Sequence, residues 1–245
     1  MSNFSALKIR GWAQTPRQIS STRKHEVGEV RYTADGRAFI YAKDGGSGLS
    51  AGKLACAKAI DSDVVNETGS AVAIGERQMT LTITAATAAI AENEFANGFL
   101  QIDDGTAAGD SYKIESNTAV AQAGTSITLT LAEPIRGTAL TTASKFTLVH
   151  NPAYGVSHTT TQASTPVGVP LVDVTANYYA WLQCEGVAAV LMEGTPGVGS
   201  KLTISAGVSG AVKKFATAED PIVGVMFGTA GVNGEYKPVR LCIGH

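Results

Sequence analysis

The amino-acid sequence predicts an all-β protein, and three observations support this prediction. The stretches MTLTIT (Met79–Thr84) and SITLTL (Ser126–Leu131) alternate strictly between apolar and polar residues, which places every second side chain on one face of an extended strand. Further β-rich segments follow at short intervals: GFLQID, KFTLVH, YYAWLQC, VAAVLM and PIVGVMF. The 27 glycines of the chain favour the many tight turns that such a fold requires.

The first 27 residues differ from the rest and are predicted to form an extended basic arm. Its five basic residues are opposed by one acid, Glu26, so its side-chain charge is +4 while the remaining 218 residues carry −6. Two interpretations stay open: the arm packs across its own subunit, or it reaches a neighbouring acidic surface. The candidate contact residues are Lys8, Arg10, Trp12, Arg17, Arg23 and Lys24. Nucleic-acid binding is not expected, because the charges are few and Trp12 is the one interleaved aromatic residue of note.

A β-hairpin is predicted next, over GEVRYTADGRAFIYAK (Gly28–Lys43). Asp35-Gly36 is a preferred two-residue hairpin turn, since both central positions of that turn need positive φ. This turn pairs Tyr32 with Phe39 and Val30 with Tyr41, so all four side chains are expected on one face of the hairpin.

The remaining elements follow from the same patterns. A Gly-rich loop leads into a strand near Lys53–Ala59, residues 61–78 and 155–177 are expected to be loops, and 177–243 returns to dense strands. The Ala-rich piece Ala85–Glu94 is the one plausible helix. Pro238 fits an edge strand or a bulge. The strands expected in the middle of the chain are Met79–Thr84, Gly98–Asp103, Ser111–Glu115, Ser126–Leu131 and Lys145–Val149.

The bulk composition indicates a globular protein that folds in a reducing cytosol. Charged residues make up 16% of the 245, below the usual quarter, which suits a β protein largely covered in an assembly. Cys56, Cys184 and Cys242 form no close cluster, so buried reduced thiols are expected and a cysteine-based zinc site is not. The N-terminus has no apolar stretch of the secretory type, and the longest apolar run is far too short to cross a bilayer.

No motif in the sequence indicates catalysis, a cofactor or a bound metal. GTPGVGSK (Gly194–Lys201) places Ser200 and Lys201 in the reverse order for a phosphate-binding loop, and a strand follows it where that motif needs a helix. DDGTAAGD (Asp103–Asp110) lacks the alternating acids of a calcium loop and is interpreted as a turn. The four histidines, at positions 25, 150, 158 and 245, are scattered, with no recognisable nucleophile arrangement beside them.

The strand pattern resembles that of the capsid decoration (cement) proteins of tailed bacteriophages. The C-terminal part of the resemblance lies in YYAWLQCEGVAAVLMEG, GVGSKLTISAGVSGAVKKF, DPIVGVMFG and YKPVRLCI. Earlier segments match the longer members of that family: VRYTADGRAFIYAKDG, LSAGKLACAKA, ANGFLQIDDGTAAGDSYKI, LTLAEPI and LVHNPAYGV. The resemblance covers most of the chain, and its motifs are structural, so it carries over no catalytic residue.

The resemblance implies a structural virion protein, made in the host cytoplasm, that binds the outside of the phage head. Its implied partners are the major capsid protein and two further copies of itself, as a homotrimer, with no nucleic acid and no membrane. It also implies a main β-barrel or sandwich lobe formed by residues 28–78 and 159–245, with 79–158 as an inserted second β lobe. The alternative is a virion surface protein that recognises a host receptor or glycan, and a glycan-active enzyme ranks last.

Overall fold

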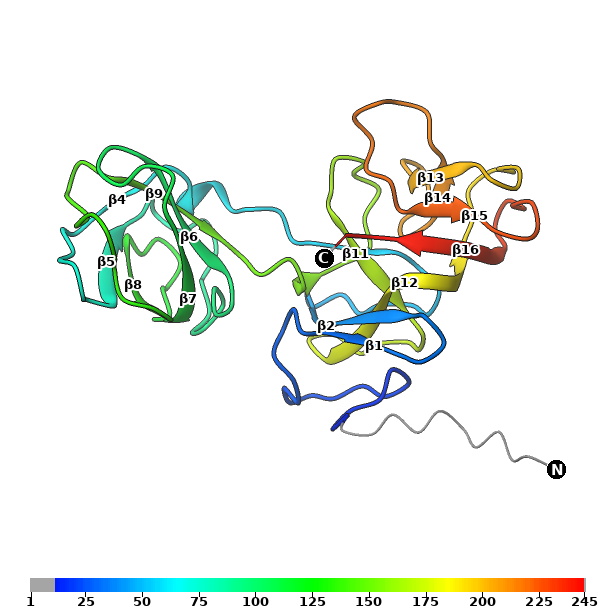
Figure 1. Cartoon of the computed structure of the whole chain (residues 1–245), viewed down its shortest axis with the longest axis horizontal. Coiled ribbons are helices and arrows are strands. Elements are labelled where there is room, and N and C mark those ends of the chain that lie inside the picture. Colours follow the sequence, from blue (N-terminus) through cyan, green and yellow to red (C-terminus); the bar gives the residue numbers. More distant parts are fainter. Residues whose placement is uncertain (1–11, 245) are drawn as a thin grey trace. The chain divides into compact units, whose positions relative to one another are not determined.

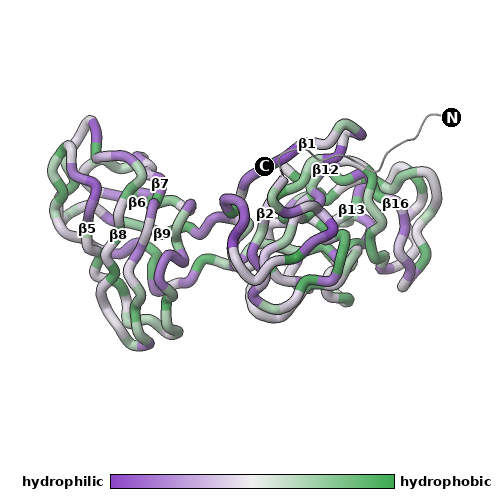
Figure 2. The backbone as a smooth tube through the Cα atoms, turned by 90° about the horizontal axis from the view of Figure 1, so that it is seen from below, coloured by the Kyte–Doolittle hydropathy of each residue, from purple (hydrophilic) through white to green (hydrophobic). Residues whose placement is uncertain are grey.

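The computed structural model describes residues 12–244 and is nearly all β, with 39% of residues in strands and 1% in helix, which confirms the predicted fold class. The chain forms two compact units (Figure 1). Unit 1 comprises the chain up to Lys58 and from Pro152 onward, and unit 2 is the continuous stretch Ala59–Asn151. One of the two sheets is a curled half-barrel. Hydrophobic and hydrophilic stretches succeed one another at short intervals in both units (Figure 2).

Unit 1 contains a ten-stranded sheet whose main path runs β1-β2-β12-β16-β15-β13-β14, with β10 paired to β2 and β11 paired to β12 and β3. Its strands are β1 (Val30–Tyr32), β2 (Ala38–Asp44), β3 (Ala55–Cys56), β10 (Tyr154–Val156), β11 (Pro166–Pro170), β12 (Tyr179–Leu191), β13 (Lys201–Ile204), β14 (Val212–Lys214), β15 (Gly224–Met226) and β16 (Tyr236–Cys242).

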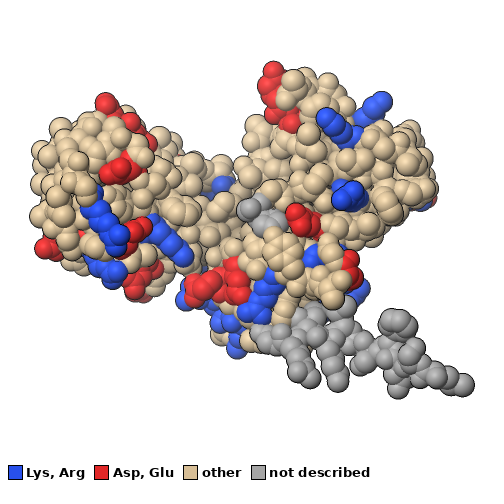
Figure 3. Space-filling view, viewed as in Figure 1, with Lys and Arg blue, Asp and Glu red and all other residues tan. Residues whose placement is uncertain are grey.

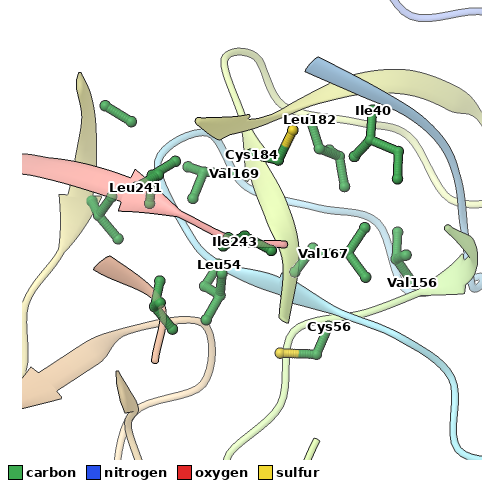
Figure 4. Packing of buried hydrophobic residues seen from close by; sticks show 14 of the residues in the cluster. Ile40, Leu54, Cys56, Val156, Val167, Val169, Leu182, Cys184, Leu241 and Ile243 are labelled. Atoms are coloured by element: carbon green, nitrogen blue, oxygen red, sulfur yellow. The ribbon is translucent and has the colours of Figure 1, made fainter. Parts of the chain in front are cut away.

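The core of unit 1 is aliphatic and draws on strands from both ends of the chain. Figure 4 shows Ile40, Leu182 and Leu241 among the side chains gathered there, together with the sulfur atoms of Cys56 and Cys184. β2 is buried on both faces: Ala38, Ile40 and Ala42 join this core, while the alternate residues Phe39 and Tyr41 belong to a separate aromatic cluster. A strand buried on both faces is a continuous apolar run, as AFIYA is.

The predicted hairpin forms, but its register is one residue different. Tyr32 pairs with Ala38 and Arg31 pairs with Phe39, so Tyr32 does not oppose Phe39. Among the described residues, Gly36 adopts positive φ (79°) and Asp35 does not, so the turn takes three residues between Thr33 and Arg37 instead of two. Because a one-residue slip moves every side chain to the other face, Arg31 comes to lie on the aromatic side of the sheet.

Unit 2 contains a six-stranded sheet in the order β4-β5-β8-β7-β6-β9. Its strands are β4 (Thr68–Gly69), β5 (Gln78–Thr82), β6 (Phe99–Asp104), β7 (Ser111–Asn117), β8 (Ser126–Leu131) and β9 (Lys145–Val149), and a 3-10 helix, η1 (Ser62–Val64), precedes them. The alternation predicted the inward residues correctly. Met79 and Leu81 of β5 pair with Leu129 and Ile127 of β8, and all four side chains are buried.

The bounds of unit 2 differ from the expected 79–158. Its first residues, expected as a loop of the main lobe, join its own sheet, because Thr68 in β4 pairs with Thr82 in β5 and Val72 bridges to Leu140. At the other end, Tyr154 in β10 pairs with Lys43 in β2, so the chain has already returned to unit 1. The two expected loops, 61–78 and 155–177, therefore contain short strands.

Two further expectations are corrected by the hydrogen bonding. Ala85–Glu94 is not helical: Ala86 N–H donates to Gly124 O at 3.0 Å, and Ile90 and Val120 exchange two bonds of 2.9 Å, so its backbone pairs across the chain. Pro238 lies in β16, an interior strand between β12 and β15. Its carbonyl accepts from Phe227 N–H, one residue beyond the end of β15. In a strand, the N and O of one residue point to the same side. The nitrogen of Pro238, which has no hydrogen to donate, therefore faces Phe227, beyond the last paired residue of β15, so no hydrogen bond between β15 and β16 is lost.

Candidate interaction surfaces

The described part of the N-terminal arm, residues 12–27, packs on its own unit. The ring of Trp12 lies on that of Trp181 in β12, with centroids 4.5 Å apart, and meets the edge of Phe39 at 6.1 Å. The guanidinium of Arg31 lies over both indoles, at 5.4 and 5.7 Å from their centroids, and Glu29 binds its Nε at 2.6 Å. A cation over aromatic faces adds electrostatic attraction to this packing.

Gln14 holds the arm in place through hydrogen bonds from a buried position. Its Nε2 donates to the carbonyls of Gln18 and Tyr179 at 2.8 and 2.9 Å, and its Oε1 accepts from the Tyr41 hydroxyl at 2.8 Å. Its backbone carbonyl accepts from Trp181 Nε1 at 2.8 Å. Ser20 and Tyr179 exchange two backbone bonds, which adds a strand-like contact. Of the two interpretations of the arm, packing across its own subunit therefore describes these residues.

Three of the five basic residues of the arm lie among the described residues. Arg17, Arg23 and Lys24 are exposed, and Arg23 pairs with Glu26 at 3.5 Å. Lys8 and Arg10 lie outside the described residues. In Figure 3 positive and negative side chains are interspersed on the visible face, between wide areas without charge. Those uncharged areas agree with the low charged fraction of the sequence.

Many of the exposed large apolar side chains belong to the C-terminal part of unit 1. Of the twelve large hydrophobic side chains that are exposed among the described residues, seven lie between positions 187 and 236. Three of them, Val198, Phe227 and Val232, come from two adjoining loops and are 61%, 51% and 40% exposed. We call these three residues the loop surface. Three exposed apolar side chains on two loops that are hydrogen-bonded to each other make the loop surface a candidate protein contact.

The two loops that carry the loop surface are tied to each other. Gly199 N–H donates to Met226 O at 3.0 Å, and Gly231 N–H donates to Pro196 O at 2.7 Å. Gly194 N–H donates to the Asn233 side chain at 2.8 Å. Gly231 also lies so close to Pro196 that a Cβ there would approach its ring to 2.5 Å. The exposed side chains therefore stand on a fixed backbone, which lowers the entropy cost of docking.

A pocket of about 300 Å³ opens in unit 1 between the β1–β2 turn, β12 and β16. It is lined by Gly36, Glu185, Gly186, Val225, Arg240, Leu241 and Cys242. Cys242 is exposed, whereas burial raises the pKa of both Cys56 and Cys184 to about 12, so those two thiols stay protonated. The prediction of buried thiols is thus confirmed for two of the three cysteines and wrong for Cys242.

Unit 2 brings together three side chains of types that can ligate a metal and that no sequence pattern connects. Asp61, Glu94 and His150 each place one ligand atom within 4.8 Å of the others. His150 Nε2 lies 3.2 Å from Glu94 Oε1, and the two side chains are 3% and 12% exposed. Glu94 and His150 are 56 residues apart, and no local motif indicates such a pairing in sequence. His158, another of the scattered histidines, lies instead in unit 1 between the backbones of Ser50 and Leu54.

The chain was compared with family models, with curated proteins and with solved structures, and none of them matches. Within residues 12–244, no helix has the length and apolarity that a membrane span requires.

Proposed function

We propose that this protein is a structural protein of a tailed-bacteriophage head, which binds the outside of the shell and stabilises the lattice of the major capsid protein. The proposal rests on the family resemblance of the strand pattern and on one structural observation, the loop surface. Val198, Phe227 and Val232 are apolar, exposed and held on hydrogen-bonded loops. A protein that binds only the assembled shell stabilises it by mass action and needs no reaction chemistry.

The strength of such a contact follows from the loop surface. Fully burying one Val or Phe side chain contributes about 1.5–3 kcal/mol. Three such side chains provide a modest contact for one chain. In a homotrimer the same contact would act three times, and the linked contacts would raise the total avidity without new interactions.

The alternative, recognition of a host receptor or glycan, has less support. That role predicts exposed aromatic side chains on the second lobe. Unit 2 has four aromatic residues, and Phe95, Tyr112 and Phe146 are buried, which leaves Phe99 as the exposed one. Sugar recognition generally uses stacking on several exposed rings, so a single phenylalanine is a weak platform.

The test is co-sedimentation with expanded heads assembled from the major capsid protein of the same genome. The wild-type chain is expected to pellet with the heads at saturable stoichiometry. Phe227→Ser is expected to weaken binding about tenfold or more, since losing 1.4 kcal/mol already costs a factor of ten. Ile74→Ser, an exposed apolar residue of unit 2, is the matched control and should bind as the wild type does. Binding that is absent, or that is equal for all three chains, contradicts the proposal.

A contact between the arm and the shell is best tested by reversing the charge of exposed arm residues, and not by deleting the arm. Removing residues 1–24 also removes Trp12 and Gln14, which cover the aromatic cluster, so a loss of binding would then report damage to unit 1. Arg17→Glu with Lys24→Glu changes exposed side chains only. If the arm contacts the shell, this double variant binds more weakly, and the difference shrinks as salt is raised.

A further inference from the structure

The three side chains Asp61, Glu94 and His150 form a constellation that the structural role does not use. All three belong to unit 2, and their ligand atoms are within 4.8 Å of one another. Two carboxylate oxygens and one imidazole nitrogen are the donor types that Zn²⁺ accepts, with bonds of about 2.0–2.2 Å. We propose that these residues bind one divalent transition ion of the Zn²⁺ class.

Backbone and ring contacts orient two members of the cluster, Glu94 and His150. Glu94 Oε2 accepts from Ala91 N–H at 2.8 Å, which leaves Oε1 directed at His150. The imidazole of His150 follows β9 directly and stacks on the buried ring of Phe95, with centroids 4.2 Å apart at 22°. Phe95 is fixed in turn, since its N–H donates to the buried side chain of Asn117 at 2.8 Å. Such supporting contacts orient the ligands of a metal site.

The distances fit a small ion. Ligand atoms of a tetrahedral zinc ion lie about 3.3 Å from one another, given its bond lengths. The pair His150 Nε2 and Glu94 Oε1 already has a separation of 3.2 Å. An ion at this position would replace the direct contact between these two atoms. The upper limit of 4.8 Å means that the third ligand needs an approach of about 1.5 Å at most.

The donor set also selects among ions. Calcium and magnesium prefer oxygen ligands alone, and magnesium keeps most of its water, so an imidazole at 3% exposure disfavours both. Two carboxylates and a neutral imidazole carry a charge of −2, which a divalent ion neutralises. The cluster contains no cysteine, so it does not provide the thiolate that sulfur-preferring ions select.

An ion at this site would join three distant parts of unit 2. Asp61 lies near its first residue, Ala59, and His150 is next to its last, Asn151, while Glu94 comes from the middle of its sequence. Because an ion that binds the folded state alone shifts the folding equilibrium, occupancy is expected to stabilise unit 2 as a whole.

The experiment uses the full chain, without a histidine tag, freed of metal by a chelator and then desalted. Zn²⁺ is titrated calorimetrically, and Co²⁺ serves as an optical probe of coordination. We expect one ion per chain, visible cobalt bands of a low-coordinate site, and a thermal transition raised by several degrees. Asp61→Asn and Glu94→Gln should each weaken Zn²⁺ binding at least tenfold, with folding of both verified by circular dichroism.

Glu92→Gln is the matched control, because Glu92 is an exposed acid of the same segment. It should bind Zn²⁺ as tightly as the wild type. Three results would overturn the proposal: no binding by the wild type, equal binding by Asp61→Asn, or a cobalt spectrum of six-coordinate type shared by every variant. The last two mean an adventitious ion only.

Discussion

The indole ring of Trp12 packs on that of Trp181, 4.5 Å away between centroids, across 169 positions of the sequence. This contact closes the aromatic cluster of Phe39, Tyr41 and Trp181 on the side of unit 1 that faces the arm. The described part of the arm, residues 12–27, is therefore a part of the fold of unit 1, in addition to any contact the arm makes with a partner.

Trp12→Ala is expected to destabilise unit 1 by about 2–3 kcal/mol, somewhat less than a fully buried tryptophan would cost, because Trp12 is half-buried. Both tryptophans of the chain belong to unit 1, so their fluorescence during urea denaturation reports that unit alone. Phe39→Leu gives a second, milder loss from the same cluster, and Arg17→Ala is the neutral control. An unchanged urea midpoint for Trp12→Ala would show that the arm does not stabilise unit 1.

Thiol reactivity should separate the cysteines. Burial raises the pKa of Cys56 and Cys184 to about 12, so at pH 8 almost none of either is thiolate, and neither is accessible. Cys242 is exposed. A chromogenic disulfide reagent is expected to titrate one thiol in the native chain and three in guanidinium, and Cys242→Ser should reduce the native count to zero. Rapid reaction of two or more native thiols contradicts this arrangement.

The stability of unit 1 should depend on pH through His158. Its Nε2 accepts from Ser50 N–H and its Nδ1 donates to Leu54 O, both at 2.8 Å, an arrangement that requires the neutral ring. Burial lowers the pKa of His158 below 6.5 in the folded state. As pH falls through 6.5, the unfolded chain takes up this proton before the folded chain does, so stability decreases with falling pH in that window.

His158→Gln is expected to cost about 1–2 kcal/mol at pH 7.5, through the two hydrogen bonds, and less at pH 5.5. The measurement is the urea midpoint of the tryptophan signal at both pH values. The other histidines remain in both chains, so the difference between variant and wild type isolates position 158. Parallel pH profiles for the two chains would refute the assignment.

Two glycines of unit 1 should respond differently to alanine. A Cβ at Gly224 would lie 2.4 Å from the Arg240 carbonyl oxygen in β16, so Gly224→Ala forces β15 away from β16 and is expected to cost about 3 kcal/mol. At Gly36 the space is open and only the positive φ of 79° opposes the change, so about 1–2 kcal/mol is expected. If urea denaturation gave the same loss of unfolding free energy for both variants, the close approach of β15 to β16 would not be the cause of the loss at Gly224.

The sequence predicted those strands best whose alternation is regular. Ser126–Leu131 and Lys145–Val149 were predicted with the bounds that the structure has. β4, β10 and β11 were missed, because two or three residues, or a run such as PVGVP, have no alternation that a pattern could detect. The helix expected at Ala85–Glu94 failed because tertiary pairing with residues 120–124 overrides the helix propensity of alanine.

The candidate surfaces were less predictable than the fold. Trp12 stays a predicted contact residue for a partner. Its packing on Trp181 within the chain is a contact that the composition of the arm does not reveal. The three members of the loop surface lie in short loops, where exposure depends on how the two loops pack together. Asp61, Glu94 and His150 meet only through the pairing of strands far apart in sequence, so residue spacing carries no signal for them.

Cys56 and Ser157 form a backbone β-bridge that bears on whether unit 2 can be removed or replaced. Each residue's N–H donates to the other's carbonyl, at 2.9 and 3.0 Å, and both belong to unit 1. The two segments that flank Ala59–Asn151 are thereby clamped together within the scaffold that remains when that stretch is cut out. A foreign domain whose two termini lie close together is therefore expected to be tolerated as an insertion between Lys58 and Pro152. A short glycine-serine linker between the same two residues is expected to give a folded unit 1 without unit 2.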